Sequence, residues 1–304
     1  MSALEELTAA IRKAAERVGP SVVAINRQGS GLVVGKDLVL TNAHNLRGDQ
    51  AVVQFPDGRE VVASIAGADV DGDLAVLNAE TGATKVIDPS EWSDAAPEVG
   101  DVVIALANPR GRGVRVTAGT ISSVGRSFRG PRGRRIQGGL EHTAPLGRGS
   151  SGGPATDASG RIVGVNTHRL QEGFYLAVVA NDELRQRISR LAAGDAPVRR
   201  RLGAAIAPAH VARHLRAAAG LPDVEGLLIR GVEEDGAADR AGLRRGDVLT
   251  AAGDRALVTI DDLYAALDGE GDLELRVVRA TDEMVVTVRF GAEAPKAEGG
   301  ETKA

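Results

Sequence analysis

The sequence contains no cysteine and very few aromatic residues. Without a thiol the chain can form no disulfide bond, no thiolate zinc site and no cysteine nucleophile. Aromatic residues make up 2% of the chain and apolar residues 43%, so aliphatic side chains, which favour packed sheets, must build the core. A length of 304 residues suits one large and one small domain.

Long apolar runs and a strong charge imbalance are also missing. No run approaches the about 18 apolar residues that span a bilayer, and residues 1–19 show helical apolar spacing in place of a signal-peptide core. These features predict a protein without a membrane span that is cytoplasmic, or periplasmic or otherwise extracytoplasmic if an export signal has been left out. The net charge of −4 argues against bulk attraction to nucleic acid or anionic membranes.

The middle of the chain is rich in short β-type runs separated by turn signals. They form two sets, in residues 20–98 and 99–180, and a helix is predicted for residues 181–193. This spacing is typical of antiparallel barrels or sandwiches. Beyond a linker at residues 194–201, strands and helices alternate in a compact α+β unit.

A glycine-dense loop surrounds Ser151 in the segment 147–154, Gly-Arg-Gly-Ser-Ser-Gly-Gly-Pro. Glycines let such a loop turn tightly, so the amides of Gly149 and Ser151 could converge on one point and stabilise an oxyanion. Taken alone, a Gly/Ser loop is more often a surface turn. Two residues upstream change that interpretation.

His44 and Asp73 also lie at strand boundaries, where each alone would be interpreted as a capping or packing residue. Together with Ser151 they occur in the order His, Asp, Ser. A serine hydroxyl is a weak nucleophile that needs a neutral imidazole as base, and a buried carboxylate fixes the imidazole tautomer. The three residues therefore predict acyl transfer.

The same loop matches the Gly-x-Ser-x-Gly elbow of α/β-hydrolases. That fold requires a helix after the serine, followed by the acid and the histidine. Here a short strand follows Ser151, so this alternative is disfavoured.

At these motifs the chain resembles the HtrA (DegP/DegS-like) serine proteases. The similarity covers about residues 20–291, including Thr-Asn-Ala-His at 41–44, Asp-Leu-Ala-Val-Leu at 73–77 and Gly-Ser-Ser-Gly-Gly-Pro at 149–154. It extends into Ala-Gly-Leu-Arg-Arg-Gly-Asp at 241–247, which resembles the PDZ domain of that family.

The resemblance implies a mostly β fold, with a two-barrel chymotrypsin-like protease domain followed by a small α+β PDZ domain. It implies that His44 is the general base, Asp73 its orienting partner and Ser151 the nucleophile. The five histidines show no spacing typical of a metal site, and no cofactor is expected. The resemblance further implies cleavage of unfolded or misfolded polypeptides in protein quality control, and a possible homo-oligomer, a trimer in relatives. The predicted segments are an N-terminal helix (1–19), the protease domain (20–193), a linker (194–201), the PDZ domain (202–291) and a disordered tail (292–304).

Substrate contacts follow from the resemblance as well. The family's Gly-Phe-Ala-Ile-Pro strand appears here as Tyr-Leu-Ala-Val-Val at 175–179. The predicted substrate-binding residues are therefore Pro145, Tyr175, Leu176 and Ala177, with a small apolar residue expected before the cleaved bond. Tyr175 replaces a glycine and could narrow the peptide groove.

The PDZ-like unit predicts binding of C-terminal or extended peptides. The residues expected to hold them are Leu202, Gly203 and Ala204, in the loop whose amides would bind the peptide's terminal carboxylate, and Leu263, Ala266 and Leu267 on a helix. The alternative for each apolar residue is an ordinary core position.

Two further alternatives remain open. A peptide-binding, chaperone-like protein with a closed protease site is suggested by Tyr175 and by the altered loop before Ser151. The arginine-rich segment 126–135 raises the possibility of nucleic-acid binding, although a solvated loop is favoured and no nucleic-acid partner is expected.

Overall fold

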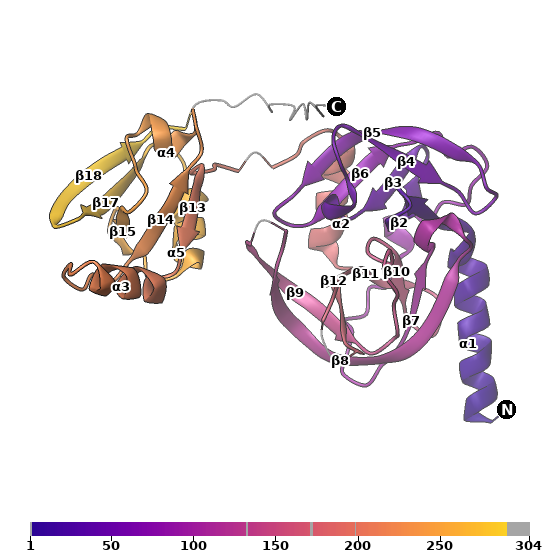
Figure 1. Ribbon diagram of the computed structural model, residues 1–304. Coiled ribbons are helices and arrows are strands. Elements are labelled where there is room, and N and C mark those ends of the chain that lie inside the picture. The colour runs from indigo at the N-terminus through magenta and orange to yellow at the C-terminus, as the bar shows by residue number, and fades with distance from the viewer. Residues whose placement is uncertain (1, 132, 171–172, 198, 291–304) are drawn as a thin grey trace, which may run out of the picture. The chain divides into compact units, whose positions relative to one another are not determined.

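The computed structural model describes residues 2–131, 133–170, 173–197 and 199–290. The chain forms two compact units, Met1–Pro197 and Val198–Ala304 (Figure 1). The predicted disordered tail, 292–304, lies outside the described residues. Among those described, no helix is both long enough and apolar enough to cross a membrane.

Six antiparallel strands close the first barrel of unit 1 in the order β1-β2-β3-β6-β5-β4. Aliphatic residues fill its interior, since Val23, Val39 and Leu77 are completely buried. The strands are β1 (Val22–Ile25), β2 (Gly29–Gly35), β3 (Leu38–Thr41), β4 (Gln50–Gln54), β5 (Glu60–Asp69) and β6 (Leu74–Asn78).

A second closed barrel follows in the order β10-β11-β12-β9-β8-β7. Its strands are β7 (Val102–Ala107), β8 (Arg115–Arg129), β9 (Arg135–His142), β10 (Pro154–Thr156), β11 (Ile162–Arg169) and β12 (Tyr175–Val179). The two barrels confirm the mostly β, chymotrypsin-like fold predicted from the sequence.

Two helices pack on the barrels of unit 1. Helix α1 (Ala3–Val18) begins with a capping box between Ser2 and Glu5 and buries Ala14 and Val18, and it contacts β7 and β8. Helix α2 (Asp182–Ala192), capped by Asn181, packs against β5 and β6. Each helix thus covers one barrel.

The described residues of the arginine-rich segment lie at the end of a hairpin. Strand β8 runs on to Arg129 and β9 begins at Arg135, so the segment is more regular than the predicted loop. Arg134 is buried and lies 3.2 Å from Asp71, and Arg126 lies 3.1 Å from Glu141. These arginines are paired with carboxylates of the same unit.

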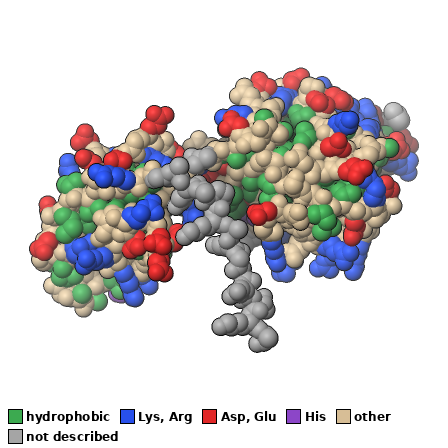
Figure 2. Space-filling model, turned by 90° about the horizontal axis from the view of Figure 1, so that it is seen from above, with side chains coloured by type: hydrophobic (Ala, Val, Ile, Leu, Met, Phe, Trp, Pro, Cys, Tyr) green, Lys and Arg blue, Asp and Glu red, His purple; other side chains and the backbone are tan. Residues whose placement is uncertain are grey.

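Unit 2 is an antiparallel sheet of order β13-β14-β15-β17-β18, with β16 paired to β15. Its core contains Leu227, Leu249 and Leu275, all completely buried. Figure 2 shows acidic and basic side chains intermixed on the surface of this unit, as on that of unit 1. The elements are β13 (Ala204–Ala207), α3 (Ala209–Ala218), β14 (Leu227–Val232), α4 (Ala237–Arg240), β15 (Val248–Ala252), β16 (Arg255–Ala256), α5 (Ile260–Leu267), β17 (Leu273–Arg279) and β18 (Asp282–Val288).

Candidate active site

His44 lies in a short 3-10 turn, η2 (Ala43–Asn45), directly after β3. The apolar strand ends at Thr41, and Asn42 keeps an extended backbone before the turn. The side chain of Asn42 donates to the carbonyl of Asp73 at 2.8 Å. The turn therefore brings the imidazole to the point where β6 begins.

Asp73 is completely buried and accepts several hydrogen bonds. Nδ1 of His44 lies 2.9 and 2.8 Å from its two carboxylate oxygens, and the backbone amide of His44 donates to Oδ1 at 3.1 Å. The Thr167 hydroxyl donates to Oδ2 at 2.7 Å. Because both carboxylate oxygens act as acceptors here, Nδ1 of His44 is the donor to Asp73 and Nε2 offers a lone pair.

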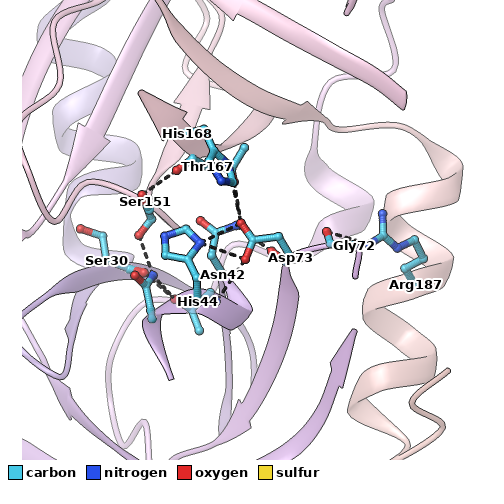
Figure 3. A network of polar contacts seen from close by, with 11 residues as sticks. Ser30, Asn42, His44, Gly72, Asp73, Ser151, Thr167, His168 and Arg187 are labelled. Atoms are coloured by element: carbon cyan, nitrogen blue, oxygen red, sulfur yellow. Dashed lines mark hydrogen bonds and ion pairs between the residues drawn. The ribbon is translucent and has the colours of Figure 1, made fainter. Parts of the chain in front are cut away.

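Ser151 approaches His44 from the loop between β9 and β10. In Figure 3 the imidazole of His44 lies between Ser151 and Asp73. The Ser151 hydroxyl donates to the carbonyl of Thr167 at 2.6 Å. The structure thus brings the three predicted residues together, with the serine hydroxyl turned toward β11.

The first barrel holds the backbone of the serine. The amide of Ser30 on β2 donates to the Ser151 carbonyl at 2.8 Å, and the side chain of Asn45 donates to the same oxygen at 2.9 Å. Thr41 links these groups, since its hydroxyl donates to the Ser30 carbonyl and accepts from Asn45. The nucleophile and the base are therefore positioned by one network across both barrels.

The residues predicted to bind an oxyanion lie on the same loop. Gly149 has φ of 88°, a conformation that favours glycine, and its carbonyl accepts from the Ser30 hydroxyl at 2.8 Å. The Ser150 carbonyl accepts from Gly153 at 3.0 Å. Because a trans peptide directs its carbonyl and N–H to opposite sides, the Ser151 amide points away from Gly153.

Thr167 and His168 also surround the triad, and their positions in the sequence did not indicate a role. Strand β11 reaches Arg169, so His168 belongs to a strand. Its ring centroid lies 5.5 Å from that of His44, and its Nδ1 lies 2.8 Å from the Thr167 hydroxyl. The polar run 166–168 at the end of an apolar strand is the signal that could have identified them.

The pKa of His168 is lowered mainly by burial. The Asp73 carboxylate opposes this effect, and the neighbouring His44 adds to it. A neutral imidazole therefore faces the triad at neutral pH.

A second histidine, His142, supports the nucleophile loop from inside the second barrel. It is completely buried, and its Nε2 lies 2.9 Å from Oδ1 of Asn166, whose side-chain nitrogen donates to Gly153 at 2.9 Å. Asn166 thus accepts the Nε2 proton, which leaves Nδ1 as a bare lone pair without a partner among the described residues. Burial lowers the pKa of His142.

The predicted substrate-binding residues differ in exposure. Pro145 is exposed, whereas Tyr175, Leu176 and Ala177 are buried on β12. This strand pairs with β9 on one edge and β11 on the other, so its backbone edges are occupied. The Tyr175 ring stacks on His142 with centroids 5.8 Å apart, and its bulk is directed to that histidine.

The residues predicted to bind peptide in unit 2 lie on β13, the segment before it and α5. Leu202, Leu263 and Leu267 are buried in the core, whereas Gly203, Ala204 and Ala266 are partly exposed. The Leu202 carbonyl accepts from Ala238, and the Gly203 carbonyl accepts from Glu233. The next amides, those of Gly203 and Ala204, therefore face the other side of the chain.

Models of two protein families match the chain. A trypsin-like peptidase domain matches residues 29–165, and a PDZ domain matches residues 228–279.

Curated relatives are identical to this chain at about a third of the aligned positions. The probable periplasmic serine endoprotease DegP-like of Brucella suis is 35% identical over 232 residues, which cover 74% of this chain and 44% of the relative. The protein of the same name in Halomonas elongata is 30% identical over 283 residues, which cover 90% of this chain and 58% of the relative. The chain thus spans about half the length of the curated relatives it matches.

The cytoplasmic location predicted from the sequence is wrong. Both relatives are named periplasmic, as is a third from Hahella chejuensis, and these names point to the periplasm. The prediction rested on residues 1–19, whose helical pattern reports how they fold and does not report the compartment.

Solved structures extend the likeness over nearly the whole chain. The HtrA-type protease AlgW with decapeptide has a TM-score of 0.66 at 23% identity and covers 94% of this chain and 99% of its own. The same protease with tripeptide has a TM-score of 0.59 at 26% identity, covering 95% and 99%. The chain belongs to the HtrA family of serine proteases, with a trypsin-like peptidase domain followed by a PDZ domain.

Proposed function

We propose that this chain is a serine endopeptidase that cleaves polypeptides through an acyl-enzyme. One observation carries the proposal: Nδ1 of His44 is held by both oxygens of the buried Asp73, and Ser151 lies on the other side of the ring (Figure 3). This arrangement suits a general base whose free nitrogen faces a nucleophile.

In the first step the Ser151 hydroxyl rotates from the Thr167 carbonyl to Nε2 of His44. Its oxygen attacks the substrate carbonyl carbon while Nε2 takes the proton, and the carbonyl oxygen becomes an oxyanion. Asp73 stays ionised and stabilises the imidazolium. The amides of Gly149 and Ser151 are the proposed oxyanion donors.

The tetrahedral intermediate then collapses. The carbon–nitrogen bond breaks, and Nε2 of His44 returns its proton to the leaving amine. Water repeats the sequence: His44 takes a proton from it, the ester of Ser151 is attacked, and the serine leaves with the proton. No cofactor is needed for either half-reaction.

Loss of the triad tests the proposal. Ser151→Ala should lower kcat for casein by roughly 10⁶-fold, and Asp73→Asn by roughly 10⁴-fold through the wrong tautomer. The matched control is Ser150→Ala, which removes the neighbouring hydroxyl and should keep the site reactive toward a fluorophosphonate. Unchanged hydrolysis by Ser151→Ala would disprove the assignment.

We further propose that unit 2 binds C-terminal or extended peptides along β13. This strand lies at the edge of the sheet. The carbonyls of Leu202 and Gly203 accept hydrogen bonds from within the unit, so the amides that follow them point the opposite way. A peptide could add as a further strand, with its carboxylate at these amides and its last side chain near Ala266. Leu263 and Leu267 would form the floor of that site.

Peptide binding can be tested by fluorescence anisotropy. A labelled peptide with a free apolar C-terminus should bind at least ~10-fold tighter than its amidated form, because the amide cannot accept charge-assisted hydrogen bonds. Ala266→Glu should abolish this difference, whereas Ala265→Glu, an exposed position on the same helix, should preserve it. Equal binding of both peptides would rule out carboxylate recognition.

The proposed substrates are unfolded or misfolded polypeptides in periplasmic quality control. A cleaved segment must be extended to reach a nucleophile whose carbonyl and loop are fixed between two barrels. Reduced, carboxymethylated substrates should therefore be cut much faster than the same proteins in folded form. Equal rates would point to recognition of folded surfaces.

The second candidate is a peptide-binding, chaperone-like protein with a resting protease site. It is favoured by the hydrogen bond from Ser151 to Thr167, which engages the hydroxyl away from His44. Fluorophosphonate labelling separates the two functions. Rapid labelling at Ser151 supports the peptidase, and its absence in protein that suppresses aggregation supports the chaperone.

A further inference from the structure

A basic hollow adjoins the nucleophile loop. It has a volume of about 360 Å³ and is lined by Arg27, Gln28, Arg110, Arg148 and Gly149. Three different segments meet there: the β1–β2 turn, the short helical turn η4 (Pro109–Gly111) and the nucleophile loop. Gly149 connects the hollow directly to the proposed oxyanion site.

The three segments are packed closely enough to define the hollow. A Cβ atom on Gly149 would lie 3.2 Å from both the Gln28 carbonyl and Pro109. The Ser30 hydroxyl also bridges the segments, donating to the Gly149 carbonyl at 2.8 Å and accepting from Asn108 at 3.0 Å. The hollow is thus built on the same support as the nucleophile.

The charge of the hollow is strongly positive although the chain carries a net charge of −4. Arg27 is paired with Glu60 at 3.1 Å. Within the residues that the structure describes, Arg110 and Arg148 have no ion-pair partner. A fourth arginine, Arg47, donates to the Gln28 side chain at 2.9 Å. Two arginines that line the hollow therefore have no carboxylate partner among the described residues.

The hollow lies on the leaving-group side of the scissile bond. His44 must return its proton to the leaving amine, so that half of the substrate passes His44 and the residues after it. Of those residues, Arg47 contacts the lining of the hollow, because it donates to the Gln28 side chain. Thr167 and His168 flank the serine from β11 instead.

We propose that Arg110 and Arg148 bind a carboxylate on the leaving-group half of the substrate, within about three residues of the scissile bond. An extended peptide advances about 3.3 Å per residue, so the residues just after the scissile bond would pass a site that adjoins Gly149. Guanidinium groups bind carboxylates through paired, charge-assisted hydrogen bonds. The carboxylate belongs either to an Asp or Glu side chain or to a nearby chain terminus. This inference rests on the proposed peptidase function.

The experiment compares quenched fluorescent peptides with amidated ends that differ at one position, the second residue after the scissile bond. With Glu there, kcat/KM should be about 10-fold higher than with Gln, and the ratio should fall as salt is added. A further peptide has Gln at the second residue after the scissile bond and ends in a free carboxylate at the third. It tests whether a chain terminus can supply the carboxylate. A peptide in which the Glu is moved to a position before the scissile bond should show no increase in kcat/KM.

Variants assign the effect to the hollow. In the double variant Arg110→Gln/Arg148→Gln, the ratio of kcat/KM for the Glu peptide to kcat/KM for the Gln peptide should fall to about one. In Arg110→Glu/Arg148→Glu, a peptide with Lys at the same position should be preferred. Arg12→Gln, an exposed position on α1, is the matched control and should keep the wild-type ratio. A ratio of one in the wild type, or an unchanged ratio in the double Gln variant, would overturn the inference.

A binding measurement separates this inference from the proposed function. Ser151→Ala should bind the Glu peptide about 10-fold tighter than the Gln peptide, and the double Gln background should remove the difference. If wild-type protein cleaves neither peptide, the peptidase function fails, and the ratio of the two dissociation constants still decides whether the hollow binds carboxylates.

Discussion

Asp73 gathers polar partners from two parts of unit 1. His44 contributes a ring N–H and a backbone amide, and Thr167 contributes a hydroxyl from β11. Asp73 itself has φ of 52°, a left-handed conformation that few non-glycine residues adopt. The surrounding hydrogen bonds hold the residue in this conformation, with its carboxylate directed at His44.

The Thr167 hydroxyl should contribute to catalysis by orienting Asp73. Thr167→Val keeps the shape of the side chain but removes a donor to a buried anion, so kcat should fall roughly 10-fold or more. Thr167→Ser restores the hydroxyl and should recover most of the loss. An equal loss in both variants, measured with one peptide substrate, would indicate a packing role for the methyl group.

Sequence patterns found the three triad residues because each stands at a strand boundary in a motif of its own. They missed the role of Thr167, which becomes apparent only when the end of β11 in the second barrel brings the hydroxyl to Asp73 of the first. The orientation of the Ser151 side chain could not be predicted from the sequence either. It depends on the rotamer of one side chain, which the position of the Thr167 carbonyl favours.

At the scale of elements, the loop 147–154 depends on close approach of backbones. Gly152 has φ of 90°, and a Cβ there would lie 2.1 Å from the Ser30 carbonyl. The obstacle is backbone, which cannot move aside without shifting β2. The glycine pattern that suggested a tight turn therefore also reflects contact with the first barrel.

Gly152→Ala should both destabilise unit 1 and reduce kcat/KM by at least ~100-fold, because strain and a clash would displace Ser151. Gly48→Ala is the matched control: its φ is 72°, yet nothing lies within 4 Å of the added Cβ. It should lower stability by about 1 kcal/mol and leave kcat/KM nearly unchanged. Thermal unfolding and peptide hydrolysis measure the two effects, and similar losses in both variants would contradict this explanation.

The succession of short strands could be predicted from alternating apolar residues and turn signals. Barrel closure and the length of the β8–β9 hairpin could not, because they depend on pairing between distant strands. Arg126 and Arg134 appeared as a solvated charge run, whereas their partners Glu141 and Asp71 are supplied by the folded barrels. Local charge patterns do not contain that information.

At the scale of the whole unit, stability should depend on pH through His142. This histidine is buried without a partner for Nδ1 among the described residues, and burial lowers its pKa in the folded state. The unfolded chain binds the proton at pH values below about 6.5, where the folded unit still excludes it. The free energy of unfolding should therefore fall as the pH falls below that value.

Urea unfolding at several pH values tests this dependence. Between pH 6.5 and the lower pKa of the folded state, the wild type should lose up to about 1.4 kcal/mol per pH unit from this group. His142→Gln removes the titration and should give a flatter profile. His210→Gln, an exposed position in unit 2, is the control, and parallel profiles for wild type and His142→Gln would exclude the assignment.

Ser30 and Asn45 hold the Ser151 carbonyl at 2.8 and 2.9 Å, although they belong to one barrel and the serine to the other. A sliding motion of the barrels by a fraction of an ångström would therefore shift the nucleophile relative to His44 without altering any triad side chain. Inhibition need not involve the substrate groove: a compound that separates β2 from the nucleophile loop would stop hydrolysis while every catalytic group stays chemically intact.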